Sequence, residues 1–353
     1  MAKIDAFFKY MLDNGASDLH LSVGAKPQLR LHGELQELNY QVLTEEMLRA
    51  LLFEIVTEEQ KQAFLEKRDL DFAYEIPSVA RFRANYFTQK RGLAAVFRII
   101  PSKILTVEDL GLPKQVLKLA NLSRGLVLVT GPTGSGKSTT LAAIIDYINR
   151  NRKDHILTVE DPIEFVHQNK GCLINQREIG THTKSFASAL KAALREDPDV
   201  VLVGEMRDLE TIELAITAAE TGHLVFGTLH TSSAAKTVDR IIDVFPSSQQ
   251  AQIRTMLSES LKGVVAQQLL KRADKPGRIA ALEILFVNVA ISNLIREGKT
   301  FQIPSIMQTA KGEGMQLLDQ MIMELLMQKT ISSEEAYMKA NDKKVFERFV
   351  KQG

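Results

Sequence analysis

Residues 126–138 read Leu-Val-Leu-Val-Thr-Gly-Pro-Thr-Gly-Ser-Gly-Lys-Ser. A short apolar run ends at Thr130, and the pattern G-x-x-x-x-G-K-[ST] of a phosphate-binding loop follows directly. Beyond it, apolar residues recur at the spacing of a helix, at Leu141, Ile144, Ile145 and Ile148. Strand, glycine-rich loop and helix follow in the order that a P-loop requires, so this stretch predicts a nucleoside triphosphate site.

The residue types of the loop suit a triphosphate. Glycines allow the backbone to curl until its N–H groups face phosphate oxygens at the positive end of the following helix. Lys137 can reach the β- and γ-phosphates, and the hydroxyl of Ser138 can bind Mg²⁺. We therefore expect ATP and Mg²⁺ as ligands. The expected nucleotide contacts are Gly131, Thr133, Gly134, Ser135, Gly136, Lys137, Ser138 and Thr139.

Further short apolar strands alternate with helical stretches after the loop. The strands are expected at 156–160, 200–204 and 224–228, and the helices near 138–150, 185–195 and 208–221. Strands that are apolar on both faces and interleaved with helices indicate a parallel sheet covered on both sides. From about Val289 onward the chain is expected to be mostly helical. The predicted fold class is α/β.

The first hundred residues have a different pattern, in which helices mix with strands of alternating polarity. A helix is expected over 4–12 and helical structure over 44–67, where Thr57 and Gln60 have the spacing of a capping box. Strands are expected at 19–23, 29–31, 70–76, 79–87 and 93–100. Two prolines and Gly111 mark residues 101–113 as a linker, so the prediction is one domain over 1–100 and another over 114–353.

Composition excludes several classes of protein. The 353 residues carry 44 Lys and Arg against 43 Asp and Glu, a net charge of +1, which argues against a protein held on DNA by bulk charge. The single cysteine, Cys172, cannot form an internal disulfide or a multi-cysteine zinc site. No apolar run approaches the ~18–20 residues of a membrane-spanning helix. We expect a cytoplasmic protein without zinc or nucleic acid.

Acidic residues follow two of the predicted strands. Glu160 and Asp161 lie where a strand must end, because Pro162 cannot continue a central strand. In the segment 197–208, four apolar residues lead to Gly204 and Glu205, which resembles a Walker B strand whose Glu205 serves the metal or its water. Ligands gather at the carboxyl ends of parallel strands, so these carboxylates are expected on the same edge as the P-loop.

Two histidines bracket the predicted strand at 224–228. An extended segment would separate His223 from His230 by about 23 Å, so one nucleotide cannot lie beside both. His230 follows the carboxyl end of the strand, on the side of the P-loop, and could donate to a γ-phosphate oxygen. His223 lies at the far end, where a role in packing or a contact with another molecule is expected.

Together these motifs resemble the secretion-type hexameric ATPases, and within them the type IV pilus retraction ATPases of the PilT group. The motifs occur in order: Ala16-Ser-Asp-Leu-His-Leu21, the P-loop, Glu160-Asp-Pro-Ile-Glu164, the strand ending at Glu205, and Leu229-His230-Thr231. The resemblance covers essentially the whole chain. It implies a PAS-like N-terminal domain joined by the linker to a RecA-like ATPase domain, assembled as a hexameric ring.

The resemblance also implies roles for individual residues. Glu164 would orient and deprotonate the attacking water, Glu205 would be the Walker B glutamate at the metal, and His230 would sense the γ-phosphate. The family supplies arginines from a neighbouring N-terminal domain, and Arg83 and Arg98 match best; each could equally be a solvated arginine on an open sheet face. The implied partner is the inner-membrane platform protein of the pilus machine, which would make this a cytoplasmic protein peripherally associated with that membrane.

Residues 290–297, Ala-Ile-Ser-Asn-Leu-Ile-Arg-Glu, resemble the AIRNLIRE element of the retraction group, with Ser292 in place of the first arginine. The chain has a short N-terminal region and a single cysteine. Pilus-assembly and type II secretion relatives instead carry extra N-terminal sequence and a four-cysteine zinc module. The alternatives are an accessory retraction, assembly, secretion or DNA-uptake ATPase, and a nucleotide-dependent ring scaffold with little turnover. A RecA-like DNA motor is disfavoured by the balanced charge.

Overall fold

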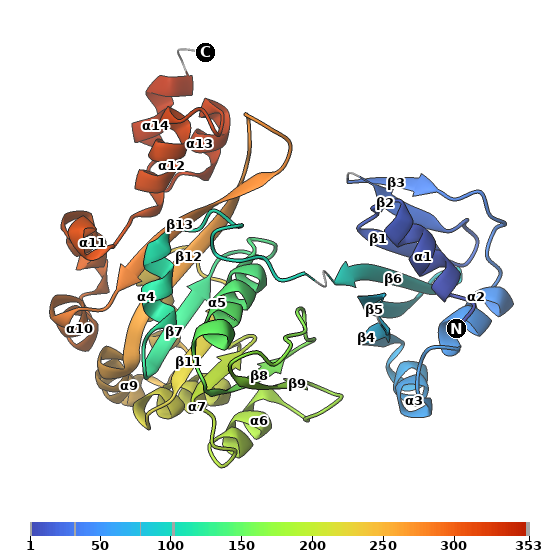
Figure 1. The fold of residues 1–353 in the computed structure, drawn as a ribbon, viewed down its shortest axis with the longest axis horizontal. Coiled ribbons are helices and arrows are strands. Elements are labelled where there is room, and N and C mark those ends of the chain that lie inside the picture. Colours follow the sequence, from blue (N-terminus) through green and yellow to red (C-terminus); the bar gives the residue numbers. More distant parts are fainter. Residues whose placement is uncertain (1, 32, 78, 101–102, 351–353) are drawn as a thin grey trace. The chain divides into compact units, whose positions relative to one another are not determined.

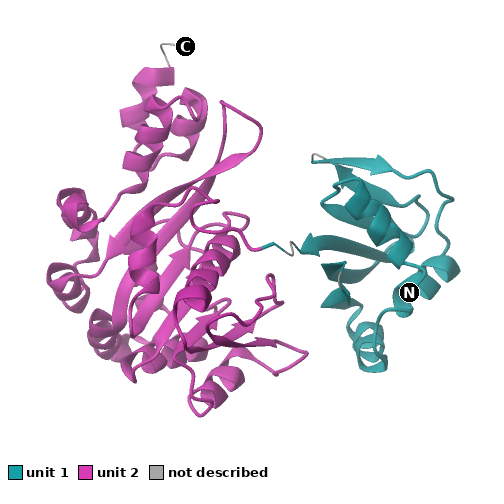
Figure 2. Cartoon of the chain, viewed as in Figure 1, with its two compact units in different colours: residues 1–103 teal, residues 104–353 magenta. Residues whose placement is uncertain are grey.

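The computed structural model describes residues 2–31, 33–77, 79–100 and 103–350. The chain divides into two compact units, Met1–Lys103 and Ile104–Gly353 (Figure 2). The boundary lies in the expected linker over 101–113, whose first two residues are outside the described part. Val107 and Leu112 are buried in the core of the second unit, because both side chains are apolar and pack against it. The segment from Val107 onward therefore belongs to the second unit and not to a linker.

The described residues of the first unit form a six-stranded antiparallel sheet with the order β3-β2-β1-β6-β5-β4 (Figure 1). Its strands are β1 (Asp18–Ser22), β2 (Gln28–Leu31), β3 (Glu34–Glu37), β4 (Asp69–Ile76), β5 (Ala80–Gln89) and β6 (Gly92–Ile100). Its helices are α1 (Asp5–Asp13), α2 (Glu45–Phe53) and α3 (Glu58–Lys67). The mixed helical and antiparallel character is confirmed, although β3 was not predicted.

Alternating polarity explains the two faces of this sheet. Along β5, Phe82 and Tyr86 are buried, whereas Arg83 is exposed on the opposite face. The ring of Phe8 from α1 stacks on Phe82 with centroids 4.4 Å apart, so the helix covers the apolar face. The predicted capping box, with Thr57 as the N-cap residue, begins α3. Arg83 and Arg98 lie on the face of the sheet opposite to the one that α1 covers.

The described residues of the second unit form a seven-stranded sheet with the order β13-β12-β7-β11-β10-β8-β9. Its strands are β7 (Gly125–Thr130), β8 (His155–Glu160), β9 (Leu173–Glu178), β10 (Val200–Val203), β11 (Leu224–Leu229), β12 (Leu261–Lys271) and β13 (Arg278–Phe286). Every adjacent pair is parallel except β12 and β13. The predicted parallel sheet is confirmed, but β9 and the β12–β13 hairpin were not predicted, and Cys172 directly precedes β9.

Helices cover both faces of this sheet. Alternate residues of β7 point to opposite sides: Val127 and Val129 pack in one apolar cluster with α5, and Leu126 and Leu128 in another with α7 and α8. The α-helices of the unit up to residue 260 are α4 (Leu117–Ala120), α5 (Lys137–Asn151), α6 (Phe186–Ala193), α7 (Leu209–Glu220), α8 (Ala234–Asp243) and α9 (Ser247–Ser260). This double cover makes every residue of β7 buried and fixes the strand that leads into the P-loop.

The end of the chain is helical, as predicted from about Val289. The helices are α10 (Val289–Arg296), α11 (Ile303–Thr309), α12 (Leu318–Met327), α13 (Ser333–Lys339) and α14 (Lys343–Val350). In the expected AIRNLIRE-like element, Ile291 and Ile295 of α10 are fully buried, which is the packing that its apolar spacing predicts. Within the described ranges, no helix is both long and apolar enough to cross a bilayer.

Candidate nucleotide site

The P-loop connects the buried strand β7 to α5. Gly131, Gly134 and Gly136 all have positive φ angles, of 146°, 77° and 88°, which residues with a side chain rarely adopt. Gly131 has a second reason to be glycine, because a Cβ there would lie 2.2 Å from the backbone oxygen of Gln267 on β12. The loop is therefore curled as a phosphate-binding loop must be, against the neighbouring strand.

The remaining predicted loop residues lie in or beside this curl. Ser138 and Thr139 are in the first turn of α5, and Thr133 and Gly134 are exposed. Ser135 is only 3% exposed, and its Oγ is buried without a hydrogen-bond partner in the part of the chain that the structure describes. We therefore expect Ser135 to contact a ligand through its backbone.

Lys137 folds back onto its own loop. Its Nζ donates to the carbonyl oxygen of Gly131 at 2.9 Å and to that of Pro132 at 3.3 Å. Burial lowers the pKa of Lys137, and the carboxylates of Glu205 and Glu164 oppose this shift electrostatically. The charges of both glutamates therefore favour the protonated lysine.

The carboxyl ends of β10 and β11 carry the next two predicted residues. Nε2 of His230 lies 2.7 Å from Oε1 of Glu205. Arg207, which the sequence did not single out, donates through Nη2 to the other carboxylate oxygen, Oε2, at 2.6 Å. Burial alone would raise the pKa of Glu205, but the hydrogen bonds from Arg207 and His230 outweigh it and lower that pKa below its ordinary value. Glu205 is thus an ionised carboxylate between two donors.

Glu160 and Glu164 have different surroundings at the end of β8. The carboxylate of Glu160 accepts from Oγ1 of Thr158 at 2.7 Å and from Nε2 of Gln176 at 3.2 Å. Burial raises its pKa. Glu164, four residues later, is exposed in the loop between β8 and β9. Of the two, Glu160 is positioned to support the loop, and Glu164 to meet solvent or a ligand.

Side chains on β9 and α5 hold the loop that carries Glu164. Nε2 of Gln176 donates to the carbonyl oxygen of Phe165 at 2.8 Å, and the backbone N–H of Ile163 donates to Glu178 at 3.0 Å. At the other end, Nδ2 of Asn149 on α5 donates to the carbonyl oxygen of Gln168 at 2.7 Å. Sequence reasoning missed these residues, since a lone amide on a helix or strand gives no sign of its distant partners.

Arg83 and Arg98 lie in the first unit, opposite one another on β5 and β6. Nη2 of Arg83 pairs with Asp71 at 2.5 Å, and Nε of Arg98 pairs with Asp18 at 2.7 Å. The side chain of Asp18 is buried, whereas the guanidinium of Arg98 is largely exposed. Two like charges directly opposite on a sheet are unfavourable, and each is compensated here by a carboxylate.

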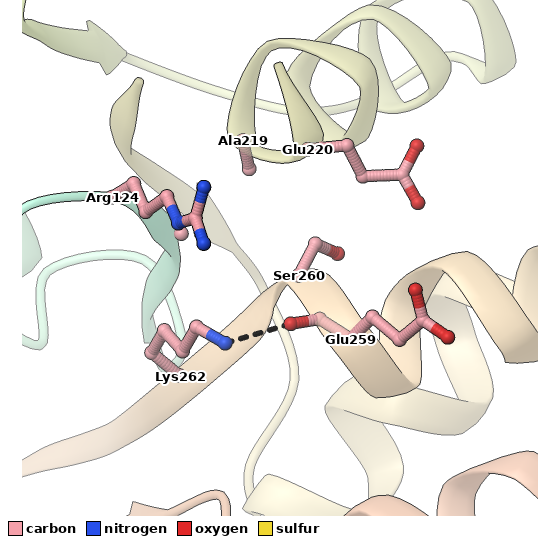
Figure 3. Close-up of a pocket in the computed structure, with 7 residues that line it drawn as sticks. Arg124, Ala219, Glu220, Glu259, Ser260 and Lys262 are labelled. Atoms are coloured by element: carbon pink, nitrogen blue, oxygen red, sulfur yellow. Dashed lines mark hydrogen bonds between the residues drawn. The ribbon is translucent and has the colours of Figure 1, made fainter. Parts of the chain in front are cut away.

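His223 lies at the other end of β11 from His230. Its Nδ1 is 2.9 Å from the carbonyl oxygen of Ala218, and its own carbonyl accepts from the N–H of Gly125, which agrees with a role in packing. Near this end of the sheet is a pocket of about 240 Å³ (Figure 3). It is lined by Arg124, Gly125, Ala219, Glu220, Glu259, Ser260 and Lys262. Because Gly125 begins β7, this pocket and the P-loop are at opposite ends of that strand.

Comparison with known proteins identifies the family. Residues 1–351 match the family described as type II/IV secretion system protein. The chain is 54% identical over 337 residues to the type IV pilus retraction ATPase PilT of Pseudomonas aeruginosa, covering 96% of this chain and 98% of that protein. It is 55% identical over 316 residues to a twitching motility protein of Neisseria gonorrhoeae, covering 90% of this chain and 84% of the relative.

A solved structure agrees with the sequence relatives. The crystal structure of the pilus retraction motor PilT with bound ADP has a TM-score of 0.91 and 47% identity to this chain, and 99% of each chain is covered. The α/β fold with an antiparallel N-terminal unit is therefore shared over the full length. The chain belongs to the type II/IV secretion system protein family and, within it, to the type IV pilus retraction ATPases.

Proposed function

We propose that the carboxyl edge of the second unit's sheet binds ATP with Mg²⁺ and hydrolyses it to drive retraction of a type IV pilus. The observation that carries this proposal is that Glu205 and His230 lie at the carboxyl edge where β11 runs parallel to β7, the strand that leads into the P-loop. Glu205 and His230 are hydrogen-bonded across β10 and β11, and Glu205 and Glu164 both act on the charge of Lys137. The ADP bound to the PilT structure supports nucleotide binding at the equivalent fold.

Each residue would have a distinct task in hydrolysis. Lys137 exchanges the carbonyl oxygens of its own loop for the β- and γ-phosphates, which are stronger acceptors because they are charged. Glu164, exposed in a loop that is held at both ends, orients the attacking water and accepts its proton. His230, oriented by Glu205, would donate to the γ-phosphate through Nδ1 when both of its ring nitrogens are protonated.

The donor set suits magnesium. The hydroxyl of Ser138 and the ionised carboxylate of Glu205 are hard oxygen ligands, which Mg²⁺ prefers, and these two residues would hold the ion. The ion, when bound, neutralises charge on the transferring phosphoryl group. A carboxylate has about four acceptor sites, so Glu205 could accept from Arg207 and His230 and still serve the ion.

We further propose that the chain works as a homohexamer in which Arg83 and Arg98 act on the nucleotide of a neighbouring copy. Arg83 and Arg98 would then exchange the carboxylates of Asp71 and Asp18 for phosphate oxygens of that nucleotide. The pair between Arg83 and Asp71 is partly exposed on both sides, and such surface pairs contribute only ~0–1 kcal/mol, so release has a low cost. An arginine at developing phosphoryl charge can contribute ~10³–10⁵-fold in rate.

The proposed partner is the inner-membrane platform protein of the pilus machine, turned by successive closures of the ring. This would make the chain a cytoplasmic protein held peripherally at that membrane. The names of the relatives, a pilus retraction ATPase and a twitching motility protein, support a role in the pilus machine. We place the hinge between an N-terminal domain and an ATPase domain close to the unit boundary at Lys103.

ATPase activity measured against protein concentration tests the proposal. A site completed by a neighbouring copy requires specific activity to rise steeply as rings assemble, and sedimentation run at the same concentrations would report the assembly. Constant specific activity across that range would refute a shared site. Failure to bind labelled nucleotide with magnesium would refute the nucleotide site itself.

A further inference from the structure

Gln267 is a buried amide beside the P-loop that lies outside the motifs. It is on β12, which pairs with β7 so that Ala266 stands opposite Thr130, the last residue before the loop. Its side chain is only 3% exposed. A carboxamide buried to this extent needs both its donor and its acceptor paired. The two groups that pair with it both belong to the P-loop and its helix.

The Gln267 side chain bridges the loop and the helix. Its Nε2 donates to the carbonyl oxygen of Ser135 at 2.7 Å, and its Oε1 accepts from Oγ1 of Thr140 at 2.7 Å. Both partner residues are themselves buried, with exposures of 3% and 1%. Solvent therefore cannot replace either bond, and loss of the amide would leave a buried carbonyl and a buried hydroxyl unpaired.

Two glycines of the motif allow this residue to come so close. A Cβ on Gly131 would lie 2.2 Å from the backbone oxygen of Gln267, and one on Gly136 would lie 2.8 Å from its Nε2. The first of these contacts is with backbone and cannot be relieved by a rotamer change. The packing of β12 against the loop thus requires glycine at position 131, and at position 136 a side chain would displace the Gln267 amide from its place.

We propose that Gln267 is a positioning residue of the nucleotide site, which aims the P-loop backbone without touching the nucleotide. The peptide between Ser135 and Gly136 is trans, so its carbonyl and its N–H point in opposite directions. Holding the Ser135 carbonyl toward β12 therefore turns the Gly136 N–H away from β12. This inference rests on the proposed nucleotide site, in which such N–H groups face phosphate oxygens.

A leucine substitution separates positioning from simple stability. Gln267→Leu removes both hydrogen bonds, and we expect it to bind fluorescent ADP with magnesium roughly tenfold to a hundredfold more weakly than the wild type. Adding Thr140→Val pairs the leucine with an apolar partner, so the thermal midpoint should recover in part. Affinity for ADP should stay low, because the Ser135 carbonyl still lacks its donor.

The matched control is Gln268→Leu. Gln268 is the next residue, and its side chain alternates to the other face of β12, so this variant should bind ADP within twofold of the wild type.

All variants are full-length chains, measured for ADP dissociation constant and for thermal midpoint without nucleotide. A folded Gln267→Leu protein that binds within twofold of the wild type would overturn the inference, and so would recovery of affinity together with stability in the double variant. If Gln267 variants do not fold, the Thr140 variants provide the test. Thr140→Val should weaken ADP binding several-fold, whereas Thr140→Ser, which keeps the hydroxyl, should not. Equal ADP binding by the two Thr140 variants would overturn the inference. A wild-type chain that fails to bind ADP would instead refute the proposed function.

Discussion

The imidazole of His230 and the carboxylate of Glu205 are hydrogen-bonded at 2.7 Å, joining the carboxyl ends of two adjacent parallel strands. The bond assigns Nε2–H to the carboxylate, so Nδ1 is the nitrogen that can face a ligand, and it can donate only when both ring nitrogens are protonated. Because Glu205 is also held by Arg207, the carboxylate is fixed on two sides and orients the ring. His230 is therefore oriented at the phosphate edge, where the doubly protonated ring can donate to a phosphate oxygen through Nδ1.

Replacing His230 with Ala should reduce ATP turnover by about 10²–10³-fold and leave ADP affinity little changed. The reason is that an oriented donor is most valuable where charge develops during phosphoryl transfer. Steady-state ATPase assays, combined with fluorescent ADP titration, measure the two quantities separately. His223→Gln, at the other end of β11, is the control and should turn over normally. Equal kcat in the His230 variant and the wild type would contradict the assigned role.

Glu164→Gln should bind ATP as the wild type does and lose nearly all turnover, because an amide orients water but cannot accept its proton. The expected loss is about 10²–10⁴-fold in kcat, the usual contribution of a general base. Single-turnover hydrolysis of labelled ATP checks this without interference from product release. Glu213→Gln, on the exposed side of α7, is the charge-matched control. Turnover near the wild-type level in the Glu164 variant would assign the base elsewhere.

The loop that carries Glu164 depends on Asn149. The Oδ1 of this residue accepts from the N–H groups of Lys170 and Cys172, and its Nδ2 donates to the carbonyl of Gln168. Asn149→Ala should lower kcat more than it changes ADP affinity, and should cost ~1–3 kcal/mol of unfolding free energy. Urea unfolding and ATPase kinetics measure both effects. A loss in affinity equal to the loss in kcat would argue against a loop-specific effect.

Much of the fold could be predicted because its signals are local. Strand β7, the loop and α5 are contiguous, and the alternation along β5 follows from period-two burial. The order of the strands is not local, which is why β12 beside β7 was not predicted. Gln267 contacts Ser135 from 132 residues away, and nothing in either segment alone indicates that pairing.

The residues of the candidate site also divide into those whose position the sequence predicts and those whose position it does not. Lys137, Glu205 and His230 could be predicted because each follows a strand whose carboxyl end must lie on one edge of the sheet. Arg207 could not, since an arginine in a turn is ordinarily a solvated side chain. For Arg98, the sequence offered no reason to expect that buried Asp18 would hold its guanidinium. Side chains that act through other side chains are specified by tertiary packing, which a sequence pattern does not contain.

His167 makes the stability of the second unit depend on pH. It is 9% exposed, in the loop after Glu164, and its Nδ1 is buried without a hydrogen-bond partner among the described residues. Burial lowers its pKa to about 4, with Asp146 opposing the shift and Lys170 adding to it. The unfolded chain has an ordinary histidine pKa of ~6.5. Between these two values the unfolded state binds a proton that the folded state does not.

Unfolding free energy should therefore fall as the pH is lowered through this window, by at most about 3 kcal/mol at 1.36 kcal/mol per pH unit. Above pH ~6.5 the histidine is neutral in both states and the effect vanishes. Buried Glu160 and Glu283 have raised pKa values and act with the opposite sign, so the wild-type curve alone would mix the effects. Subtracting the urea-unfolding free energies of His167→Asn from those of the wild type at each pH cancels the glutamates. Between pH 7 and pH 4, the wild type should lose about 3 kcal/mol of unfolding free energy relative to the His167→Asn variant. A difference that is independent of pH would show that His167 is protonated as easily in the folded protein as in the unfolded chain.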